Sequence, residues 1–411
     1  MKQAWRHLWR SRRRSILTLV AVFIPVLILV LELGLLNGEQ ESLFRNTVTL
    51  ETGHLQIRAA TDRPEGGALA LMKDPAAALA VLDSVPGIAW RTERLDLPAM
   101  ISNGGRSQGI LLQGVVPEEV GRVSPIGRLV TEGNYLTTGA RGVVIGGELR
   151  DLLAASVGSE LVLLGVHPDT GIGAASVPVL GVYAAPDPAM GRALVQVDLA
   201  LAQTLARRPG AVTSIVAFVD EVEGPWDAAK VEKVVVELRA RLPKDYKVLD
   251  YNELAPELKT FEQVEKPFHI MAMSIFFILG GLVVLNTLFL SVVERTHELG
   301  IILALGSSRR RVMRMVMTEA LLLALVGAAA GLATGGALVA WAQASGGLTM
   351  PGAYSDSLRL MGMEPVLQLR VSVFEYLVSG LAMVGVALLS AWIPARRAAS
   401  LEPVEAMRHV D

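Results

Sequence analysis

The residues best suited to chemistry or binding stand in one charged stretch, Glu294 to Glu319, which lies between two long apolar segments. Its first charges, Glu294, Arg295 and Glu298, are expected to open a short helix. After Gly306 the stretch becomes strongly basic, with Arg309, Arg310, Arg311 and Arg314. Charged side chains are costly inside a bilayer, so the pattern predicts a corner of two helices just outside a membrane. Gly306 is expected to end the first helix by adopting a positive φ, and one of the two serines that follow is expected to cap the second.

The apolar side of this corner, from Leu299 to Leu305, would be poorly solvated on a free amphipathic helix. It predicts either packing back onto the membrane surface or docking into a groove of a cytoplasmic protein. A pattern E-x-G-I-x-x-A-L-G before an arginine-rich helix favours docking. A basic loop that only enforces topology and is held by anionic lipids is the alternative reading.

Motifs for catalysis are missing from the sequence. It contains no G-x-x-x-x-G-K-[ST] phosphate loop, no H-E-x-x-H and no G-x-S-x-G. The six histidines are scattered without ligand spacing, and the absence of cysteine excludes disulfides and thiolate metal sites. A net charge of −2 gives no argument for nucleic-acid binding. We therefore expect no enzyme activity, no metal and no cofactor in this chain, and no nucleic-acid partner.

Two polar residues stand inside apolar segments and are candidates for a substrate path. Glu32 falls near the outer end of the first apolar segment, where it could also reach water, and Asn286 falls in the inner half of the second. For Asn286 a hydrogen bond between helices is the favoured reading. The third apolar segment carries Gly327, Gly331 and Gly335 at intervals of four, which predicts a ridge for close helix packing; the general abundance of glycine in membrane helices is the alternative.

The composition indicates which elements must position these residues. With 52% hydrophobic and 19% charged residues among 411, the chain is too apolar for an ordinary soluble protein and too charged for a bundle buried wholly in lipid. We predict transmembrane helices at 15–37, 267–293, 316–342 and 373–393. An arginine-rich amphipathic helix at 1–14 precedes the first; a cleaved signal peptide is the alternative to an uncleaved anchor there.

The remaining segments lie between these helices. Residues 38–266 have the composition of a folded α/β domain large enough for two subdomains. Residues 294–315 form the corner, 343–372 an outer connection and 394–411 a polar tail. Basic residues gather at the N-terminus, the corner and the tail, so the positive-inside rule places both termini and the corner in the cytoplasm. The 38–266 domain then lies outside.

These residues carry a family resemblance. The run ERTHELGIILALGSSRRRVMRMVMTE followed by the glycine ridge resembles the signature of the FtsX/MacB-type ABC permeases, also called mechanotransmission ABC proteins. The matching positions are Glu294-Arg295, Glu298-Leu299-Gly300, Ala304-Leu305-Gly306, Arg309 to Arg311 and Glu319. The tail PARRAASLEPVEAMR is similar to the C-terminal pattern of the same family, with Met407 in place of Leu.

The resemblance implies a fold and a set of partners. It implies four transmembrane helices with a porter-like and a Sabre-like subdomain inserted between the first and second. It also implies an ATPase-coupling role for the corner, carried by Glu294, Arg295, Glu298, Gly300, Ala304, Leu305, Gly306, Arg310 and Arg311. The implied partners are a cytoplasmic ABC ATPase dimer, which would hold ATP and Mg²⁺, a second permease copy or paralogue, and membrane lipids.

Three subfamilies fit this layout to different degrees. The LolC/LolE type releases lipoproteins from the inner membrane to a periplasmic carrier, and it matches the span number, the length and the separate ATPase. A MacB-like efflux permease working with a periplasmic adaptor is the second possibility. An FtsX-like transmitter that activates an external enzyme and moves nothing is the third. We expect lipoprotein release.

Overall fold

The computed structural model describes residues 12–61, 69–72, 74–120, 125–167, 171–185, 188–260, 263–264, 266–349, 355 and 366–401. The predicted N-terminal amphipathic helix up to residue 11, half of the outer connection (350–354 and 356–365) and the tail from residue 402 lie outside them. The chain divides into two compact units. We call Met1–Glu39, Phe261–Leu348 and Leu367–Asp411 the helical unit, and Gln40–Thr260 with Thr349–Val366 the α/β unit.

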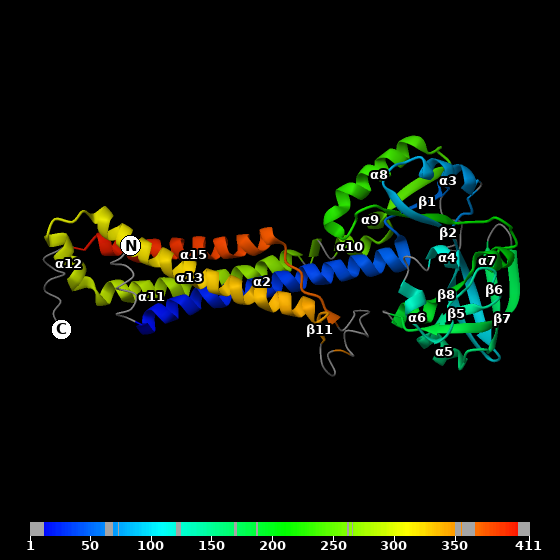
Figure 1. Cartoon of the computed structure of the whole chain (residues 1–411), viewed down its shortest axis with the longest axis horizontal. Helices are drawn as coiled ribbons and strands as arrows, with labels where there is room; N and C mark the ends of the chain where they lie inside the picture. Colours follow the sequence, from blue (N-terminus) through cyan, green and yellow to red (C-terminus); the bar gives the residue numbers. More distant parts are fainter. Residues whose placement is uncertain are drawn as a thin grey trace. The chain divides into compact units, whose positions relative to one another are not determined.

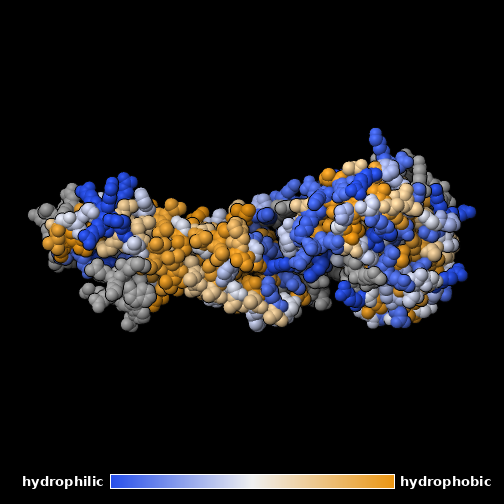
Figure 2. Space-filling model, turned by 45° about the horizontal axis from the view of Figure 1, so that its top comes forward, coloured by the Kyte–Doolittle hydropathy of each residue, from blue (hydrophilic) through white to orange (hydrophobic). Residues whose placement is uncertain are grey.

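Four long helices dominate the helical unit (Figure 1), namely α2 (Arg12–Thr47), α11 (Lys266–Glu294), α13 (Arg309–Ala344) and α15 (Val373–Ala399). Over the part of the chain that the structure describes, these four are long and apolar enough to cross a membrane. The space-filling view shows apolar side chains gathered on the outer surface of these helices (Figure 2). The prediction of four membrane helices is therefore confirmed.

Small and β-branched residues form the core of the helical unit. Its buried members come from all four helices and include Val22, Val26, Val284, Leu288, Ala320, Ala324, Met383 and Ala387. Helix α15 packs against both α11 and α13. Small side chains let helices approach closely in lipid, where van der Waals packing rather than water exclusion holds them together.

Two helix ends differ from the sequence expectation. Helix α15 continues through Pro394 to Ala399 instead of ending at Ile393. A proline inside a helix removes one hydrogen bond and its ring crowds the carbonyl group four residues earlier. Here Pro394, Ala395 and Ala398 are all buried against the end of the bundle, so packing outweighs that loss. Helix α2 extends to Thr47 and passes into a π-helix, η1 (Val48–Thr52), so its last residues contribute to the α/β unit.

The first part of the α/β unit is a ferredoxin-like βαββαβ fold. Its elements are β1 (Leu55–Ala59), α3 (Pro75–Asp83), β2 (Ile88–Asn103), β9 (Ser214–Val219), α8 (Ala228–Arg241) and β10 (Tyr246–Asp250). The strands pair antiparallel in the order β10-β1-β9-β2, which is the split βαβ arrangement. Alternate strand residues such as Leu55, Ile57 and Val248 face α3 and α8 and form one core with them.

The second part is inserted between β2 and β9 and closes into a ring of strands. Hydrogen-bonded pairs run β2-β3-β8-β5-β7-β6 and return to β2. The strands added are β3 (Arg106–Val115), β5 (Val143–Gly146), β6 (Glu160–His167), β7 (Gly171–Tyr183) and β8 (Leu194–Asp198). Inward residues of these strands pack with α5 (Gly147–Leu153) and α7 (Leu199–Leu205) in a second core.

Short elements complete the α/β unit and its edges. They are α4 (Pro117–Val120), η2 (Pro125–Arg128), β4 (Val130–Gly133), α6 (Pro188–Ala193), η3 (Pro225–Asp227), α9 (Tyr251–Leu254) and α10 (Pro256–Thr260), with the strand pair β11 (Leu348–Thr349) and β12 (Val366–Leu367). The predicted α/β domain is therefore confirmed, and its buried residues fall into three clusters, two of which Leu199 joins. Strand β2 belongs to both parts, because its first half pairs with β9 and its second half with β3 and β6.

His54 is a buried titratable group at the base of the ferredoxin-like part. It is 6% exposed, and its Nδ1 accepts a hydrogen bond of 2.9 Å from the backbone N–H of Val219. The rings of Phe44 and Phe218 flank it at centroid distances of 6.0 and 5.3 Å. Burial lowers the pKa of His54 from 6.5 to about 4, because the charged imidazolium is disfavoured away from water.

The lowered pKa predicts that acid destabilises the α/β unit. The unfolded chain takes up a proton below its pKa of 6.5, whereas folded His54 resists protonation until about pH 4, so this stability is complete above pH 6.5 and is lost as the pH falls towards 4. We expect a loss of about 2 kcal/mol between pH 7.5 and pH 5. Denaturant titrations at both pH values measure it, and Trp90 is a local reporter because its ring lies 5.2 Å from that of Phe218. In His54→Gln this part of the pH dependence should vanish; an unchanged dependence in that variant would contradict the assignment.

Candidate coupling site

The predicted corner is present, and its boundaries follow from backbone hydrogen bonds. Helix α11 runs up to Glu294, and the short helix α12 (Thr296–Ala304) begins two residues later. The amide of Gly306 donates to Leu303 O, and that of Ser307 donates to Ile302 O. These two bonds define a Schellman motif, in which the residue in the position of Gly306 has positive φ. Gly306 has φ +88°, so its predicted conformation is confirmed.

Two details of the corner were predicted wrongly. Glu294 ends α11 instead of opening the short helix, because the apolar helix continues to this residue without a break. Ser308 does occupy the N-cap position of α13, but its side chain makes no capping hydrogen bond. The first turn of α13 is closed by backbone groups instead, since the amide of Arg311 donates to Ser308 O at 2.8 Å.

Arg295 ties the corner to the next membrane helix. Its Nη1 lies 3.3 Å from Glu319 Oε2 on α13, and its Nε lies 3.4 Å from Glu298 Oε2 on α12. The side chains of Arg295 and Glu319 are only 19% and 11% exposed. An ion pair shielded in this way is costly to break from one side, because the remaining charge loses its partner in a poorly solvated place. The Arg295–Glu319 pair therefore holds α12 in one orientation.

One side of α12 is part of the protein core. Leu299 is 3% exposed and packs with Val292, Val312 and Val316 from the flanking helices, as well as with Ala395 and Ala398 at the end of α15. Gly300 is buried beside it. The guanidinium of Arg397 lies over the ring of Phe289 at 4.9 Å and joins α15 to α11 at the same end. The corner is thus a rigid extension of the helix bundle.

The opposite side of α12 remains apolar yet faces outward. Leu305 is 81% exposed and Ile301 is 40% exposed, and Ala304 is exposed between them. Glu298, Arg310 and Arg311 are exposed around this patch. An apolar centre with a charged rim is the usual anatomy of a protein interface. This exposed side of α12 is the candidate site for docking a partner.

The predicted glycine ridge of α13 lies against α2. A side chain at Gly327 would meet Val22 Cβ at 2.9 Å, and one at Gly331 would meet Val26 Cβ at 2.9 Å. A side chain at Gly335 would meet Val30 Cγ1 at 2.9 Å. The contacted valines of α2 increase by four in residue number, as the glycines of α13 do. The two helices therefore run parallel and in close contact.

The structure separates the two residues of the candidate substrate path. Glu32 Oε1 lies 3.3 Å from His269 Nδ1 at the start of α11, and both side chains are mostly buried. Asn286 lies on the exposed surface of α11, 17 residues further along that helix and hence about 25 Å from His269. A contact between Glu32 and a histidine was not anticipated, although His269 is the one ionisable residue between Pro267 and Val293.

Two protein-family models match this chain. The model of the MacB-like periplasmic core domain matches residues 15–238, and that of the FtsX-like permease C-terminal region matches residues 270–403. The chain belongs to the FtsX/MacB family of ABC transporter permeases. With its four apolar helices, this permease is a multi-pass membrane protein with an extracellular domain, the α/β unit.

Individual relatives are distant. The permease is 23% identical to the lipoprotein-releasing system transmembrane protein LolC of Xylella fastidiosa over 97% of this chain and 96% of that protein. It is 25% identical to the pyoverdine export ATP-binding/permease protein PvdT of Pseudomonas putida, over 99% of this chain and 59% of that protein. The periplasmic region of MacB from Actinobacillus actinomycetemcomitans aligns with 52% of this chain at 12% identity and TM-score 0.34.

Proposed function

We propose that this permease couples ATP hydrolysis by a partner ATPase to movement of its α/β unit, and that the work done is the release of lipoproteins from the membrane. The observation that carries the coupling step is the outward apolar patch of Ile301 and Leu305 on a helix held by the Arg295–Glu319 ion pair. A patch that is apolar and rigid needs a partner surface. Lipoprotein release is supported by the relative LolC, whose length this chain matches almost completely.

The distribution of basic residues supports one orientation of the permease in the membrane. Helices α2 and α13 run parallel, as the glycine contacts require, and both begin with arginine clusters at 12–14 and 309–311. Helix α15 carries Arg396 and Arg397 in its last turn, beside the corner. We place this basic end in the cytoplasm by the positive-inside rule. Both termini and α12 are then cytoplasmic, and the α/β unit is periplasmic in a bacterial inner membrane.

This orientation places a proposed partner on each side of the membrane and one within it. A cytoplasmic ABC ATPase dimer would dock on α12 and would hold ATP and Mg²⁺. A second permease copy or a paralogue would complete the membrane part. A periplasmic lipoprotein carrier would accept the released substrate. In this scheme the permease chain itself has no catalytic residue.

Reconstitution tests the proposed activity. Liposomes containing the permease, its cognate ATPase and a fluorescent lipoprotein should release the lipoprotein to a soluble carrier when ATP is added. The same liposomes with a non-hydrolysable ATP analogue provide the baseline. ATP hydrolysis that proceeds at the normal stimulated rate without any lipoprotein reaching the carrier would rule out this substrate and would leave the coupling step standing.

A second candidate function is export of a soluble compound. The observation favouring it is that PvdT, named as a pyoverdine exporter, matches 99% of this chain. In that case a periplasmic adaptor would replace the lipoprotein carrier. Transport of a labelled small molecule in the same liposomes, with the lipoprotein unmoved, would select this function over the first.

A further inference from the structure

The α/β unit carries a cleft on the face of its sheet that α3 and α8 leave uncovered. Strand residues alternate in direction, so the neighbours of the buried Ile57, Leu95 and Val248 face this side. The main hollow measures about 520 Å³, and a smaller one of about 170 Å³ adjoins it through the shared residues Arg58, Leu69 and Leu254. The larger hollow alone has the size of a typical small-molecule site.

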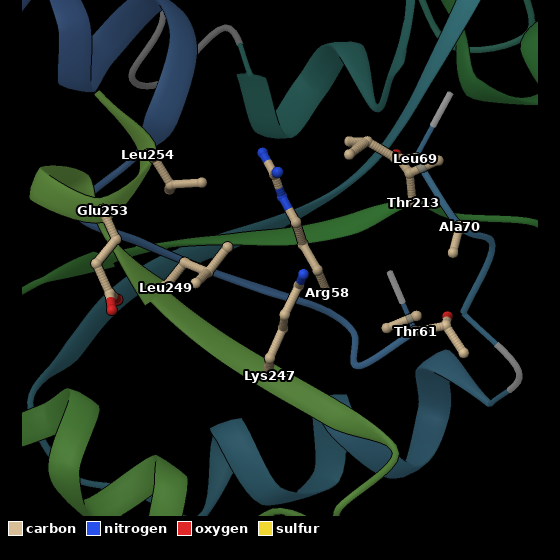
Figure 3. A pocket seen from close by; sticks show the side chains of 10 residues that line it. Arg58, Thr61, Leu69, Ala70, Thr213, Lys247, Leu249, Glu253 and Leu254 are labelled. Atoms are coloured by element: carbon tan, nitrogen blue, oxygen red, sulfur yellow. The ribbon is translucent and has the colours of Figure 1, made fainter. Parts of the chain in front are cut away.

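Two cations stand together at one end of this cleft. Arg58 on β1 and Lys247 on β10 are directly opposite each other in the antiparallel register, and both line the smaller hollow (Figure 3). Like charges in this position repel each other and lower stability. Glu253 is the one acidic residue among the lining residues that the structure describes, and its carboxylate lies 2.6 Å from Arg239. Arg58 Nε also donates to the neutral Gln56 Oε1 at 2.8 Å, so among the described lining residues this end carries more positive than negative charge.

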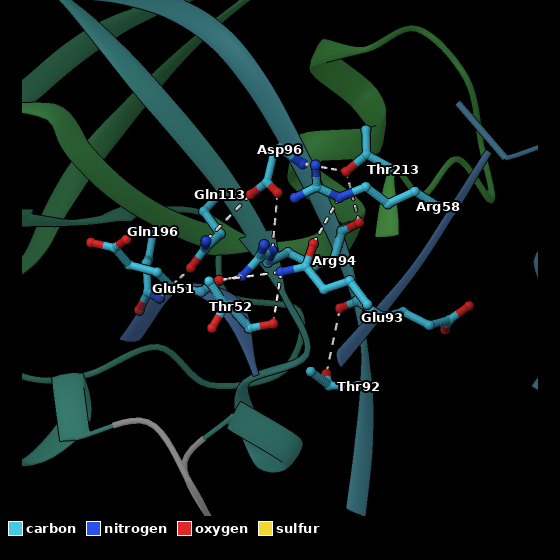
Figure 4. Close-up of polar contacts among 11 residues, drawn as sticks. Glu51, Thr52, Arg58, Thr92, Glu93, Arg94, Asp96, Gln113, Gln196 and Thr213 are labelled. Carbon is cyan, nitrogen blue, oxygen red and sulfur yellow. Dashed lines mark hydrogen bonds and ion pairs between the residues drawn. The ribbon is translucent and has the colours of Figure 1, made fainter. Parts of the chain in front are cut away.

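A buried polar chain forms the middle of the cleft (Figure 4). Arg94 Nε donates to Asp96 Oδ2 at 3.0 Å, and Arg94 Nη1 donates to Glu51 O. Gln113 Nε2 donates to Asp96 Oδ1, and behind it Gln196 and Tyr135 continue the chain. Arg94 and Asp96 are 8% and 6% exposed, yet both line the hollow. The charges of this pair offset each other, and Glu51 is a further acidic lining residue, so the middle of the cleft supplies fixed polar groups and no excess of positive charge.

The other end of the cleft is apolar. Leu111 on β3 is the register partner of both Pro98 on β2 and Leu194 on β8, and all three line the larger hollow with Met190 of α6. Leu111 is 42% exposed, so this wall is open to a ligand. Along the strand order β10-β1-β9-β2-β3-β8, the cleft thus changes from cationic through polar to apolar.

We propose that this cleft binds a single-chain amphiphile with an anionic head group, the head between Arg58 and Lys247 and the chain against Leu111, Leu194 and Met190. The gradient of the lining matches such a molecule from end to end, and neither a purely apolar compound nor a small anion would use both ends. A carboxylate head and a phosphate head share the required charge. The inference concerns the α/β unit alone and does not depend on ATPase coupling or lipoprotein release.

The absence of cysteine from the chain allows a direct binding assay on the full-length permease. A single cysteine at Met190→Cys would carry a polarity-sensitive fluorophore, with the protein held in nanodiscs of zwitterionic lipid. A second labelled variant, Lys233→Cys on the outer surface of α8, reports any unspecific effect of the amphiphile. Octyl phosphate, octanoate and octyltrimethylammonium are the titrants, and inorganic phosphate is the competitor without a chain.

The anionic titrants should give a saturable change at position 190 and none at position 233, and octyltrimethylammonium should give none at either. The tighter of the two anions identifies the head group. In the double variant Arg58→Gln/Lys247→Gln, affinity should fall at least about tenfold, because two charge-assisted contacts are lost. Leu111→Ser should weaken binding about fivefold by reducing apolar burial, whereas Lys233→Gln, in the Met190→Cys protein, should leave affinity unchanged.

Three results would overturn the proposal. The first is an equal response to the cationic amphiphile, which would show general hydrophobic adsorption. The second is unchanged affinity in Arg58→Gln/Lys247→Gln while that variant melts at the parent temperature. The third is competition by inorganic phosphate as strong as that by octyl phosphate, which would remove the role of the apolar end. None of these measurements involves ATP, so they are separate from the reconstitution test.

Discussion

Replacing Leu305 with aspartate is expected to prevent stable binding of the partner ATPase and to leave the permease folded. Leu305 is 81% exposed and lies at the C-terminus of α12, so its removal costs the permease little packing energy. In the docked state, however, a buried leucine contributes about 2 kcal/mol, and burying an unpaired carboxylate adds a further penalty. We expect the affinity for the ATPase to fall about 100-fold or more.

Co-purification with the tagged ATPase and the rate of stimulated ATP hydrolysis measure this effect. Leu152→Asp is the matched control, because Leu152 is also an exposed leucine, 39% exposed, but lies on the α/β unit. Charge reversal in Glu298→Arg should weaken docking more moderately, since it places a second cation beside Arg295. Undiminished co-purification and hydrolysis with Leu305→Asp would show that the ATPase docks elsewhere.

Gly306 offers a further control on the geometry of the corner. No atom lies within 4 Å of a side chain built at this position, so the size of a replacement matters less than its backbone preference. Because φ is +88°, asparagine should be tolerated and valine should not. Gly306→Asn is therefore expected to retain coupling and Gly306→Val to lose it.

Local features of the fold could be predicted from the sequence because short-range signals determine them. Asn103-Gly104-Gly105 is a typical hairpin turn sequence and joins β2 to β3, and the largely apolar run Ser214–Val219 is typical of a strand and forms β9. The end of α12 followed from the conformational freedom of Gly306. In each case the residues that decide the structure lie within a few positions of one another.

Features that join distant segments could not be predicted in the same way. Periodicity indicates that β6 is a strand, but it contains no information on the pairing of β6 with β2 that closes the ring. The pairs Glu32–His269 and Arg295–Glu319 join residues 237 and 24 positions apart. The cleft is likewise lined by residues from β1, β2, β3, β8 and β10, so no contiguous sequence motif predicts it.

The contact between α2 and α13 links the corner to a helix whose last residues belong to the α/β unit. Helix α13 starts five residues after the end of α12 and packs its glycines on Val22, Val26 and Val30 of α2. The same α2, with η1, supplies Phe44 and Val48 to the core of the ferredoxin-like part. In the proposed coupling, a displacement of α12 would pass to α13 and, through the glycine contacts, to α2.

Filling this contact should uncouple the two ends and destabilise the bundle. In Gly335→Val the new side chain would overlap Val30 Cγ1, which lies 2.9 Å from the added Cβ position. Overpacking of this kind typically costs about 1–3 kcal/mol. We expect a loss of about 2 kcal/mol in the free energy of unfolding, measured by denaturant titration in mixed micelles with tryptophan fluorescence. Ala333→Val, at an exposed position of the same helix, should have little effect.

A compensating change distinguishes this contact from a general loss of stability. The three atoms nearest to a side chain at Gly335 all belong to Val30, so Gly335→Val/Val30→Gly exchanges the two side chains and should recover most of the loss. At Gly331 the nearest atoms include the backbone oxygen of Phe23 at 2.9 Å, which no substitution removes. Gly331→Val/Val26→Gly should therefore stay destabilised. Equal recovery at both positions, or at neither, would contradict the packing of α13 on α2.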